Sequence, residues 1–404
     1  MKKLISDSIS RRRFIKTAAV TASTVGLADA LHLIKPLSAA PSQKNLNTRS
    51  LPTRELGRTG VKLPILQLGT SQSLNAVYDK VLHRSFREGV NVLDTALSYG
   101  WGSSHRAIAN FIGQIGDRKN LWITSKSSAW DASGLIADVD KCLDQLKTDY
   151  LDLYLMHGPD DVDYLDPDYI RAGEKLRKSG KVRFFGFSNH GSDIVPMMHK
   201  AVKTGGIDAI LFRYNFRYYG KTELNRALDA CKRAGIGLIA MKTMGGVSSR
   251  DEKVIKFQSK NFSLAQAKLK SVWEDDRIDA VCSEMHNVKE VRENTAAARS
   301  GLGLSSREKF QIELLAEKTK HLACLGCSNI CEGSVVGDTP IADTLRYLMY
   351  HETYGKTDRA RQLYQDLPKS VKSFDDAEIA VATRACPQGI NIAARLSKAR
   401  EELA

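Results

Sequence analysis

The chain has 404 residues, of which 42% are hydrophobic and 26% are charged. This composition is typical of a globular protein with a large core and excludes a disordered or fibrous chain. Beyond residue 40 the basic excess within the net charge of +14 is scattered rather than gathered into runs, so we expect no nucleic-acid-binding surface.

The N-terminal segment is basic and then weakly apolar. Residues 10–16 read SRRRFIK, and an Ala- and Thr-rich segment follows at residues 17–30. That segment is too short and too weakly apolar to predict a membrane-spanning helix. The basic stretch resembles the twin-arginine export motif, with Arg11 and Arg12 as the pair. The resemblance implies a signal peptide over residues 1–40, recognition by the twin-arginine export machinery and a periplasmic location. A basic surface helix is the alternative.

After a polar linker at residues 41–52, a hairpin is expected at 53–70, turning near Arg58, Thr59 and Gly60. Strand-like runs and amphipathic helical patterns then alternate. The strands are expected at 65–68, 91–93, 121–124, 151–156, 183–187, 209–212, 237–241 and 279–282. The helices are expected at 77–88, 105–115, 133–146, 167–178, 194–204, 223–233, 264–273 and 288–298.

This alternation is typical of parallel βαβ units. Eight units in about 250 residues predict an α/β fold of the closed (β/α)8 TIM-barrel type. A doubly wound sheet is the alternative, but no G-x-G-x-x-G follows the first strand, which argues against a Rossmann cofactor site.

Three successive strands end in titratable side chains. Asp94 ends one strand and is followed five residues later by Tyr99, Lys126 ends the next, and His157 ends the third. Because the carboxyl ends of barrel strands meet at one mouth, we expect these four side chains to lie close together.

Residues 53–300 resemble an aldo-keto reductase. The motifs RELGRTG, VNVLDTALSYG, ITSK, LYLMHGP, GFSNH and RYN occur in the family's order and spacing. The resemblance implies hydride transfer between a nicotinamide cofactor and a carbonyl or alcohol substrate, with Asp94, Tyr99, Lys126 and His157 as the catalytic tetrad.

The tetrad suits that chemistry. A carbonyl that receives hydride develops negative charge on oxygen, which a nearby proton donor must neutralise. Tyr99 is the expected acid, Lys126 would stabilise its phenolate, Asp94 would hold Lys126, and His157 would orient the carbonyl. The alternative is an inherited barrel that binds a ligand without reacting.

The resemblance also implies a site for NADP or NAD. The residues that it assigns to cofactor binding are Ser188, Asn189, Met241, Lys242 and Asn294. Two positions depart from the family pattern, because Leu211 replaces a Gln that binds the nicotinamide amide and Met241 replaces a Tyr that stacks on the ring.

Two carboxylates also stand where the family reads a 2′-phosphate. Glu284 replaces a Gly or Lys, and Glu290 replaces an Arg. Like charges repel the phosphate unless Lys289 and Arg292 compensate. We therefore expect nicotinamide binding to be weakened or shifted towards the form without the 2′-phosphate.

Residues 301–404 form a separate, mainly helical module in this reading, with one helix at 307–321 and two more within 341–367. The module resembles a reduced two-cluster ferredoxin. The four cysteines that remain correspond to the ligands of a single [4Fe–4S] cluster. They are Cys324, Cys327, Cys331 and Cys386. Zinc, disulfides or an empty relic are the alternatives.

The other residues support weaker expectations. Cys142, Cys231 and Cys282 are expected to be buried apolar residues. Trp101 and Trp130 are expected either to wall the substrate pocket or to cover the barrel rim.

Two functions follow from these patterns. The first is an exported, nicotinamide-dependent oxidoreductase acting on a small carbonyl or alcohol. The second is an exported iron–sulfur electron-transfer or binding protein that meets a redox partner and whose barrel has lost catalysis. The complete tetrad favours the first.

Overall fold

The computed structural model describes residues 49–404 except 130, 160–161, 192, 337–338 and 368–375. The predicted export signal, most of the linker and Trp130 therefore lie outside the described residues. The described residues belong to one compact unit. None of their helices combines the length and apolar character needed to cross a membrane.

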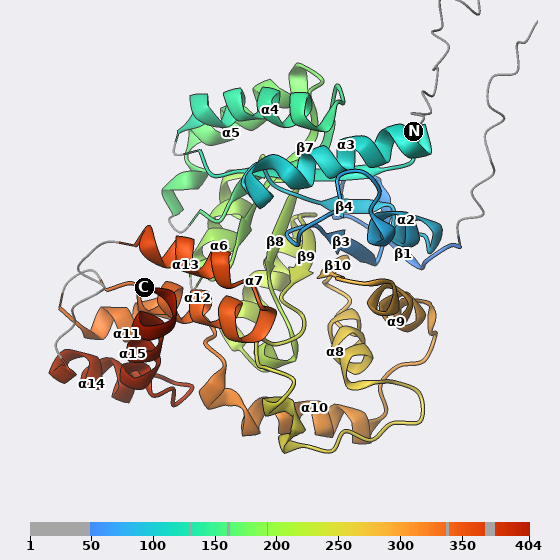
Figure 1. The fold of residues 1–404 in the computed structure, drawn as a ribbon. Coiled ribbons are helices and arrows are strands. Elements are labelled where there is room, and N and C mark those ends of the chain that lie inside the picture. The colour runs from blue at the N-terminus through green and yellow to red at the C-terminus, as the bar shows by residue number, and fades with distance from the viewer. Residues whose placement is uncertain (1–48, 130, 160–161, 192, 337–338, 368–375) are drawn as a thin grey trace, which may run out of the picture. The chain divides into compact units, whose positions relative to one another are not determined.

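Eight parallel strands close into a barrel in the order β10-β3-β4-β5-β6-β7-β8-β9 (Figure 1). The strands are β3 (Leu66–Gly69), β4 (Val92–Asp94), β5 (Trp122–Ser127), β6 (Leu151–His157), β7 (Val182–Asn189), β8 (Ala209–Arg213), β9 (Gly237–Met241) and β10 (Ala280–Glu284). The predicted (β/α)8 TIM barrel is confirmed.

The barrel helices follow their strands in turn. They are α2 (Lys80–Arg87), α3 (Ser103–Ile115), α4 (Ala132–Leu146), α5 (Pro167–Lys178), α6 (Ile194–Thr204), α7 (Thr222–Arg233), α8 (Leu264–Trp273) and α9 (Val288–Arg299). Most bounds lie within two residues of the prediction. Helix α2 begins later than predicted because Asp79 caps it, its side chain accepting from the backbone N–H groups of Val81 and Leu82.

Side chains alternate between the inside of the barrel and its helical coat, as the pleat of a strand requires. One apolar cluster inside the barrel includes Leu153, Leu155, Leu211 and Ile239. The predicted hairpin, β1 (Thr53–Glu55) with β2 (Lys62–Pro64), contributes Leu56 and Leu63 to this cluster. The hairpin therefore closes the barrel at the end where the strands begin.

Three carboxylates, two of them buried and one partly buried, tie neighbouring strands together at that same end. Asp152, Asp208 and Asp279 each accept the backbone N–H of an adjacent strand, and each also pairs with a basic side chain. The basic partners are Arg118 and Arg183 for Asp152, Arg177 for Asp208, and Lys232 for Asp279. Because a buried charge is tolerated only when it is paired and hydrogen-bonded, these contacts hold the strand register. The opposite end stays available for the site.

The remaining helices come from the C-terminal hundred residues, drawn orange to red in Figure 1. They are α10 (Ser306–Lys318), α11 (Ser328–Cys331), α12 (Ile341–Tyr354), α13 (Thr357–Gln365), α14 (Asp376–Ala385) and α15 (Ile392–Leu403). The two helices expected within 341–367 are thus α12 and α13. An apolar cluster of their own joins α11, α12, α14 and α15 through residues such as Ile341, Leu345, Ile379 and Leu396.

Candidate active site

The four predicted catalytic side chains meet at the carboxyl ends of β4, β5 and β6. Val92 lies inside the barrel, so Asp94, two residues later on β4, faces inwards as well. On β5 the same alternation places Trp122 inside the barrel and, four residues later, Lys126, which is 1% exposed. His157 ends β6, and Tyr99 begins the short helix η2 (Tyr99–Gly102) after β4. Strand alternation therefore explains how distant sequence motifs converge.

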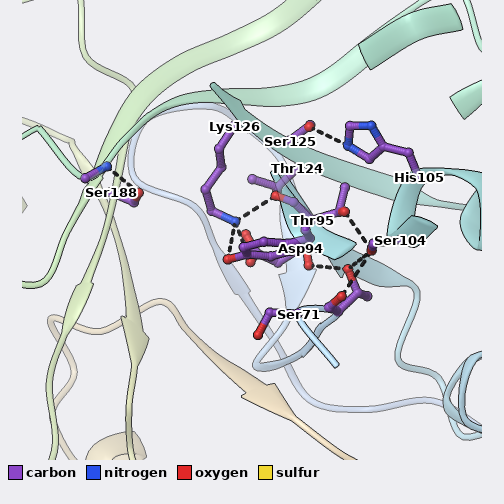
Figure 2. A network of polar contacts seen from close by, with 12 residues as sticks. Ser71, Asp94, Thr95, Ser104, His105, Thr124, Ser125, Lys126 and Ser188 are labelled. Atoms are coloured by element: carbon purple, nitrogen blue, oxygen red, sulfur yellow. Dashed lines mark hydrogen bonds and ion pairs between the residues drawn. The ribbon is translucent and has the colours of Figure 1, made fainter. Parts of the chain in front are cut away.

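The centre of the site is the buried ammonium of Lys126. Its Nζ donates to Asp94 Oδ1 at 2.7 Å and to the Thr95 carbonyl at 2.7 Å, and it lies 3.5 Å from Tyr99 Oη (Figure 2). An ammonium has three N–H donors, so these oxygens account for all of them. The arrangement offsets the cost of burying the charge and leaves one donor aimed at the phenol.

Tyr99 is enclosed by the other members of the tetrad. Lys126 Nζ lies 4.9 Å from the centre of its ring, and the His157 ring meets it edge-on at a centroid distance of 5.7 Å. Burial, followed by the negative charge of Asp94, raises the pKa of Tyr99 well above its usual value. The phenol is therefore protonated near neutral pH and can act as a proton donor.

His157 is a neutral imidazole. Burial, followed by repulsion from Lys126, lowers its pKa to about 3. Its Nδ1 is buried and has no hydrogen-bond partner among the described residues. A buried polar atom without a partner is costly, so this nitrogen is suited to bind a polar ligand.

A network of hydroxyl groups behind the tetrad holds the neighbouring loops. Ser104 Oγ contacts Thr70 Oγ1 at 2.8 Å and Thr95 Oγ1 at 2.9 Å (Figure 2). Thr70 Oγ1 also donates to the Asp94 carbonyl at 2.9 Å. These bonds fix the turn between Asp94 and Tyr99. Sequence analysis missed them because isolated Ser and Thr residues carry no distinguishing pattern.

His105 is a second residue whose place the sequence did not reveal. The sequence singles out no role for it, but it is fully buried on α3. Its Nε2 lies 3.0 Å from Ser125 Oγ, next to Lys126 on β5, and its Nδ1 lies 2.9 Å from Gln145 Oε1. Burial lowers its pKa to about 4. His105 therefore acts as a neutral brace behind the Lys126 strand.

The residues expected to bind the cofactor lie at the ends of later strands. Ser188 and Asn189 end β7 and are buried, and Met241 ends β9. The Asn189 amide donates to the Pro159 carbonyl at 2.7 Å and to Asp193 Oδ2 at 2.8 Å. Asn294, on α9, donates to Ser283 Oγ at 3.2 Å. The structure thus gathers these residues around the mouth, and their assignment to a cofactor stays a prediction.

Lys242 links the barrel to the C-terminal helices. It follows Met241 with a φ of 59°, a left-handed conformation rare for a side chain of its kind. Its Nζ lies 4.4 Å from the ring centre of Tyr350 and 4.9 Å from that of Tyr354, both on α12. Helix α12 therefore contacts the barrel mouth as well as the C-terminal helices.

Glu284 has a partner that the sequence did not indicate. Lys356, between α12 and α13, donates to both of its carboxylate oxygens, at 2.7 and 2.8 Å, and to Ser71 Oγ at 2.7 Å. Glu290 instead accepts the His286 backbone N–H at 2.8 Å. The cation that compensates Glu284 thus comes from the C-terminal segment, and not from Lys289 or Arg292.

The four predicted metal-ligating cysteines are all free and lie near one another. Cys331 belongs to the C-terminal apolar cluster, and Cys324 and Cys386 pack against it. Cys327 and Cys386 each raise the pKa of Cys324, after the larger effect of burial. Even so, no three or more His, Cys, Asp or Glu side chains of the described residues are placed to hold a metal ion. The structure therefore gathers the cysteines without bringing them to ligand spacing.

The other predicted residues have simple positions. Trp101 is 76% exposed and does not wall the site. Cys142, Cys231 and Cys282 are buried, as predicted. Cys282 lies inside the barrel, where its thiol is close enough to Asp94 to affect the pKa of that carboxyl.

The pair of Glu284 and Lys356 should contribute measurable stability. Both side chains are about one-fifth exposed, so the pair is only partly screened by water. In a double-mutant cycle with Glu284→Gln and Lys356→Met, we expect a coupling free energy of about 1 kcal/mol that falls with added salt. Urea unfolding of the four proteins measures it. The matched cycle on Asp144 and Lys147, a pair more than two-thirds exposed, should give nearly zero. Equal couplings in the two cycles would argue against docking of the C-terminal segment.

Comparisons with known proteins agree with this geometry. L-galactose dehydrogenase of Arabidopsis thaliana is 25% identical over 308 residues, covering 67% of this chain and 95% of that protein. Glyoxal reductase of Bacillus subtilis is 30% identical over 224 residues, covering 52% of this chain and 75% of that protein.

Solved structures show the same fold. An aldo-keto reductase of Bacillus halodurans in its holo form superposes with a TM-score of 0.57 at 20% identity, covering 66% of this chain and 96% of that one. An aldo-keto reductase of Klebsiella pneumoniae in complex with NADPH gives 0.54 at 21% identity, covering 66% and 95%. The model of the aldo/keto reductase family matches residues 66–302, more than half of the chain. This protein therefore belongs to the aldo/keto reductase family.

Proposed function

We propose that this chain is an exported, NADP- or NAD-dependent reductase of small carbonyl compounds, with Tyr99 as the proton donor. The observation that carries the proposal is the convergence of Lys126 Nζ on Asp94 and Tyr99. Family membership supports an oxidoreductase. The names of relatives, glyoxal reductase and L-galactose dehydrogenase, support a small polar carbonyl or alcohol as the substrate.

The residues of the mouth fit a bound nicotinamide and carbonyl. Buried polar atoms without partners in the described part of the chain include His157 Nδ1, His190 Nδ1 and Gln72 Oε1. Gln72 already donates to the Met285 carbonyl at 2.9 Å, which leaves its oxygen to accept from a ligand. When bound, the reduced nicotinamide supplies the hydride.

The protein side chains provide the proton. As hydride reaches the carbonyl carbon, Tyr99 Oη gives its proton to the carbonyl oxygen, and the product is an alcohol. Lys126 stabilises the phenolate that forms, and Asp94 keeps the ammonium charged and in place. His157, neutral because of its low pKa, orients the carbonyl without competing for the proton. The raised pKa of Tyr99 keeps its phenol protonated at neutral pH, which is the form that reduction of a carbonyl requires.

Replacing Tyr99 tests this role. We expect Tyr99→Phe to lower kcat for reduction of methylglyoxal by at least about 100-fold while leaving NADPH binding and the unfolding midpoint unchanged. The wild type should keep its activity up to about pH 10, because the pKa of the donor is raised and not lowered. Trp101→Phe, an exposed aromatic neighbour, is the control.

The assay separates binding from chemistry. NADPH oxidation followed by absorbance gives the rate, and cofactor fluorescence gives the affinity. Folded wild-type protein that binds neither NADPH nor NADH would refute the enzyme proposal and leave the barrel as a binding scaffold.

We also propose export by the twin-arginine route to the periplasm. The support is the SRRRFIK segment with Arg11 and Arg12. Cell fractionation should find the wild type in the periplasm and the Arg11→Lys, Arg12→Lys variant in the cytoplasm. Periplasmic recovery of both proteins would contradict the proposal.

We further propose that Cys324, Cys327, Cys331 and Cys386 hold one [4Fe–4S] cluster. The number and type of donors suit such a cluster, and an N–H from Gly326 already points at Cys324 Sγ at 3.4 Å. The thiols do not stand at ligand spacing, so no electron-transfer step is derived from them.

Metal analysis of anaerobically purified protein tests the cysteine site. We expect about four iron atoms and matching acid-labile sulfide per chain, lost in Cys386→Ser and retained in the buried-cysteine control Cys142→Ser. Zinc in place of iron, or oxidised cysteines without metal, would exclude the cluster.

A further inference from the structure

A cavity of about 680 Å³ lies between the barrel and the C-terminal helices. Its barrel wall is the loop from Gly246 to Lys253 together with Arg213 at the end of β8, and its other wall comes mainly from α12 and α15. This cavity is separate from the contacts of the tetrad, and neither the family match nor the relatives assign it a ligand.

The cavity has more cations than anions in its walls. The cations are Arg213, Arg250, Lys253, Arg346, Arg395 and Lys398. The acids are Asp251, Glu352 and Glu402. Glu352 is already paired with Arg395, at 2.5 Å, and with Lys398, at 2.7 Å. Glu402 lies 3.1 Å from His351 and 3.7 Å from Lys398, and its Oε2 has no hydrogen-bond partner among the described residues. Both acids therefore lie beside basic groups of the C-terminal helices.

The cations on the barrel side lack such partners. Within the described residues, Arg213, Arg250 and Lys253 form no ion pair. Arg213 Nη1 donates to the Cys324 carbonyl at 3.1 Å, which is a neutral acceptor. Arg346 pairs with Asp343 at 2.8 Å through Nη2, but its Nε is buried and has no hydrogen-bond partner among the described residues.

Two titratable side chains next to the cavity, His190 and Tyr350, have pKa values that its cations shift. The Nδ1 of His190 is buried, and burial followed by Arg346, Lys242 and Arg213 lowers the pKa of His190 well below the usual value. Burial alone would raise the pKa of Tyr350, but Lys242, Arg346 and Arg213 outweigh burial and lower it to about 8. Cations held this close together at partly buried positions are costly unless an anion joins them.

We propose that this cavity binds the phosphate or carboxylate group of a small molecule, with Arg213 and Arg346 as its principal contacts. A guanidinium presents paired N–H donors that match an oxyanion. Arg250 and Lys253 are exposed at the loop and attract the ligand at longer range. The anion comes either from the phosphates of a dinucleotide or from a separate anionic compound, and hydride transfer by Tyr99 is not required for either.

Binding of inorganic phosphate to the full mature chain tests the proposal. Isothermal titration should show saturable binding to the wild type and a dissociation constant raised roughly tenfold or more in Arg346→Gln, because a charged hydrogen bond is lost. Arg171→Gln removes an exposed arginine paired with Asp168 and is the matched control, expected to bind as the wild type does.

A second variant guards against misfolding of the first. Arg250→Gln with Lys253→Gln changes only exposed side chains and should weaken phosphate binding without lowering the unfolding midpoint. Affinities for phosphate that are equal in the wild type, both variants and the control would overturn the proposal. So would the absence of phosphate binding together with unaltered NADPH affinity in the variants.

Parallel titration with NADPH identifies the source of the anion. If Arg346→Gln weakens NADPH and phosphate competes with it, the cavity holds the phosphates of the dinucleotide. If phosphate binding falls while NADPH affinity is unchanged, the cavity is a site for a separate anionic ligand. Because phosphate is measured by itself, failure of the proposed reductase function would not be mistaken for failure of the anion site.

Discussion

The buried ammonium of Lys126 is the constraint on which the site depends. A charge removed from water must be surrounded by oxygens at hydrogen-bonding distance, and here Asp94 and the Thr95 carbonyl supply them at 2.7 Å. Both come from the chain around the end of β4, whereas Lys126 comes from β5. The register of these two strands, with Asp94 opposite Thr124, therefore decides whether Tyr99 has a cation beside it. The carboxylates at the other end of the barrel, Asp152 among them, help to keep that register.

The sequence predicts those parts of this arrangement that depend on local patterns of residues. Alternating strand and helix signals predicted the barrel, and a titratable residue at each of three strand ends predicted the convergence of the tetrad. Contacts between residues far apart in the chain left no such pattern. Ser104 contacts Thr70, 34 positions away, His105 contacts Ser125, 20 positions away, and Lys356 contacts Ser71, 285 positions away. Their residue types are common on any surface or helix, so only the folded chain distinguishes them.

The C-terminal segment forms the cysteine module and also contacts the barrel mouth. Arg213 at the end of β8 donates to the Cys324 carbonyl, and Tyr218 donates to the Leu325 carbonyl at 3.2 Å. Both bonds join the mouth directly to the loop that carries the cysteines. A change in the state of those thiols that moves this loop must also alter the environment of Arg213. The module and the carboxyl end of the barrel strands are thus connected through two backbone carbonyls.

The charge at the barrel mouth also depends on contacts with the C-terminal segment. Taken alone, Glu284 predicts repulsion of a cofactor phosphate. In the folded chain its carboxylate is neutralised by Lys356, while Lys242 turns towards the faces of Tyr350 and Tyr354. The turn after α12 therefore neutralises the Glu284 carboxylate on β10, and α12 itself holds the Lys242 ammonium against two aromatic rings. The charge at the mouth therefore depends on how firmly α12 is held on the barrel, because loss of that contact would expose a free carboxylate at Glu284 and a free ammonium at Lys242 at the ends of the neighbouring strands β10 and β9.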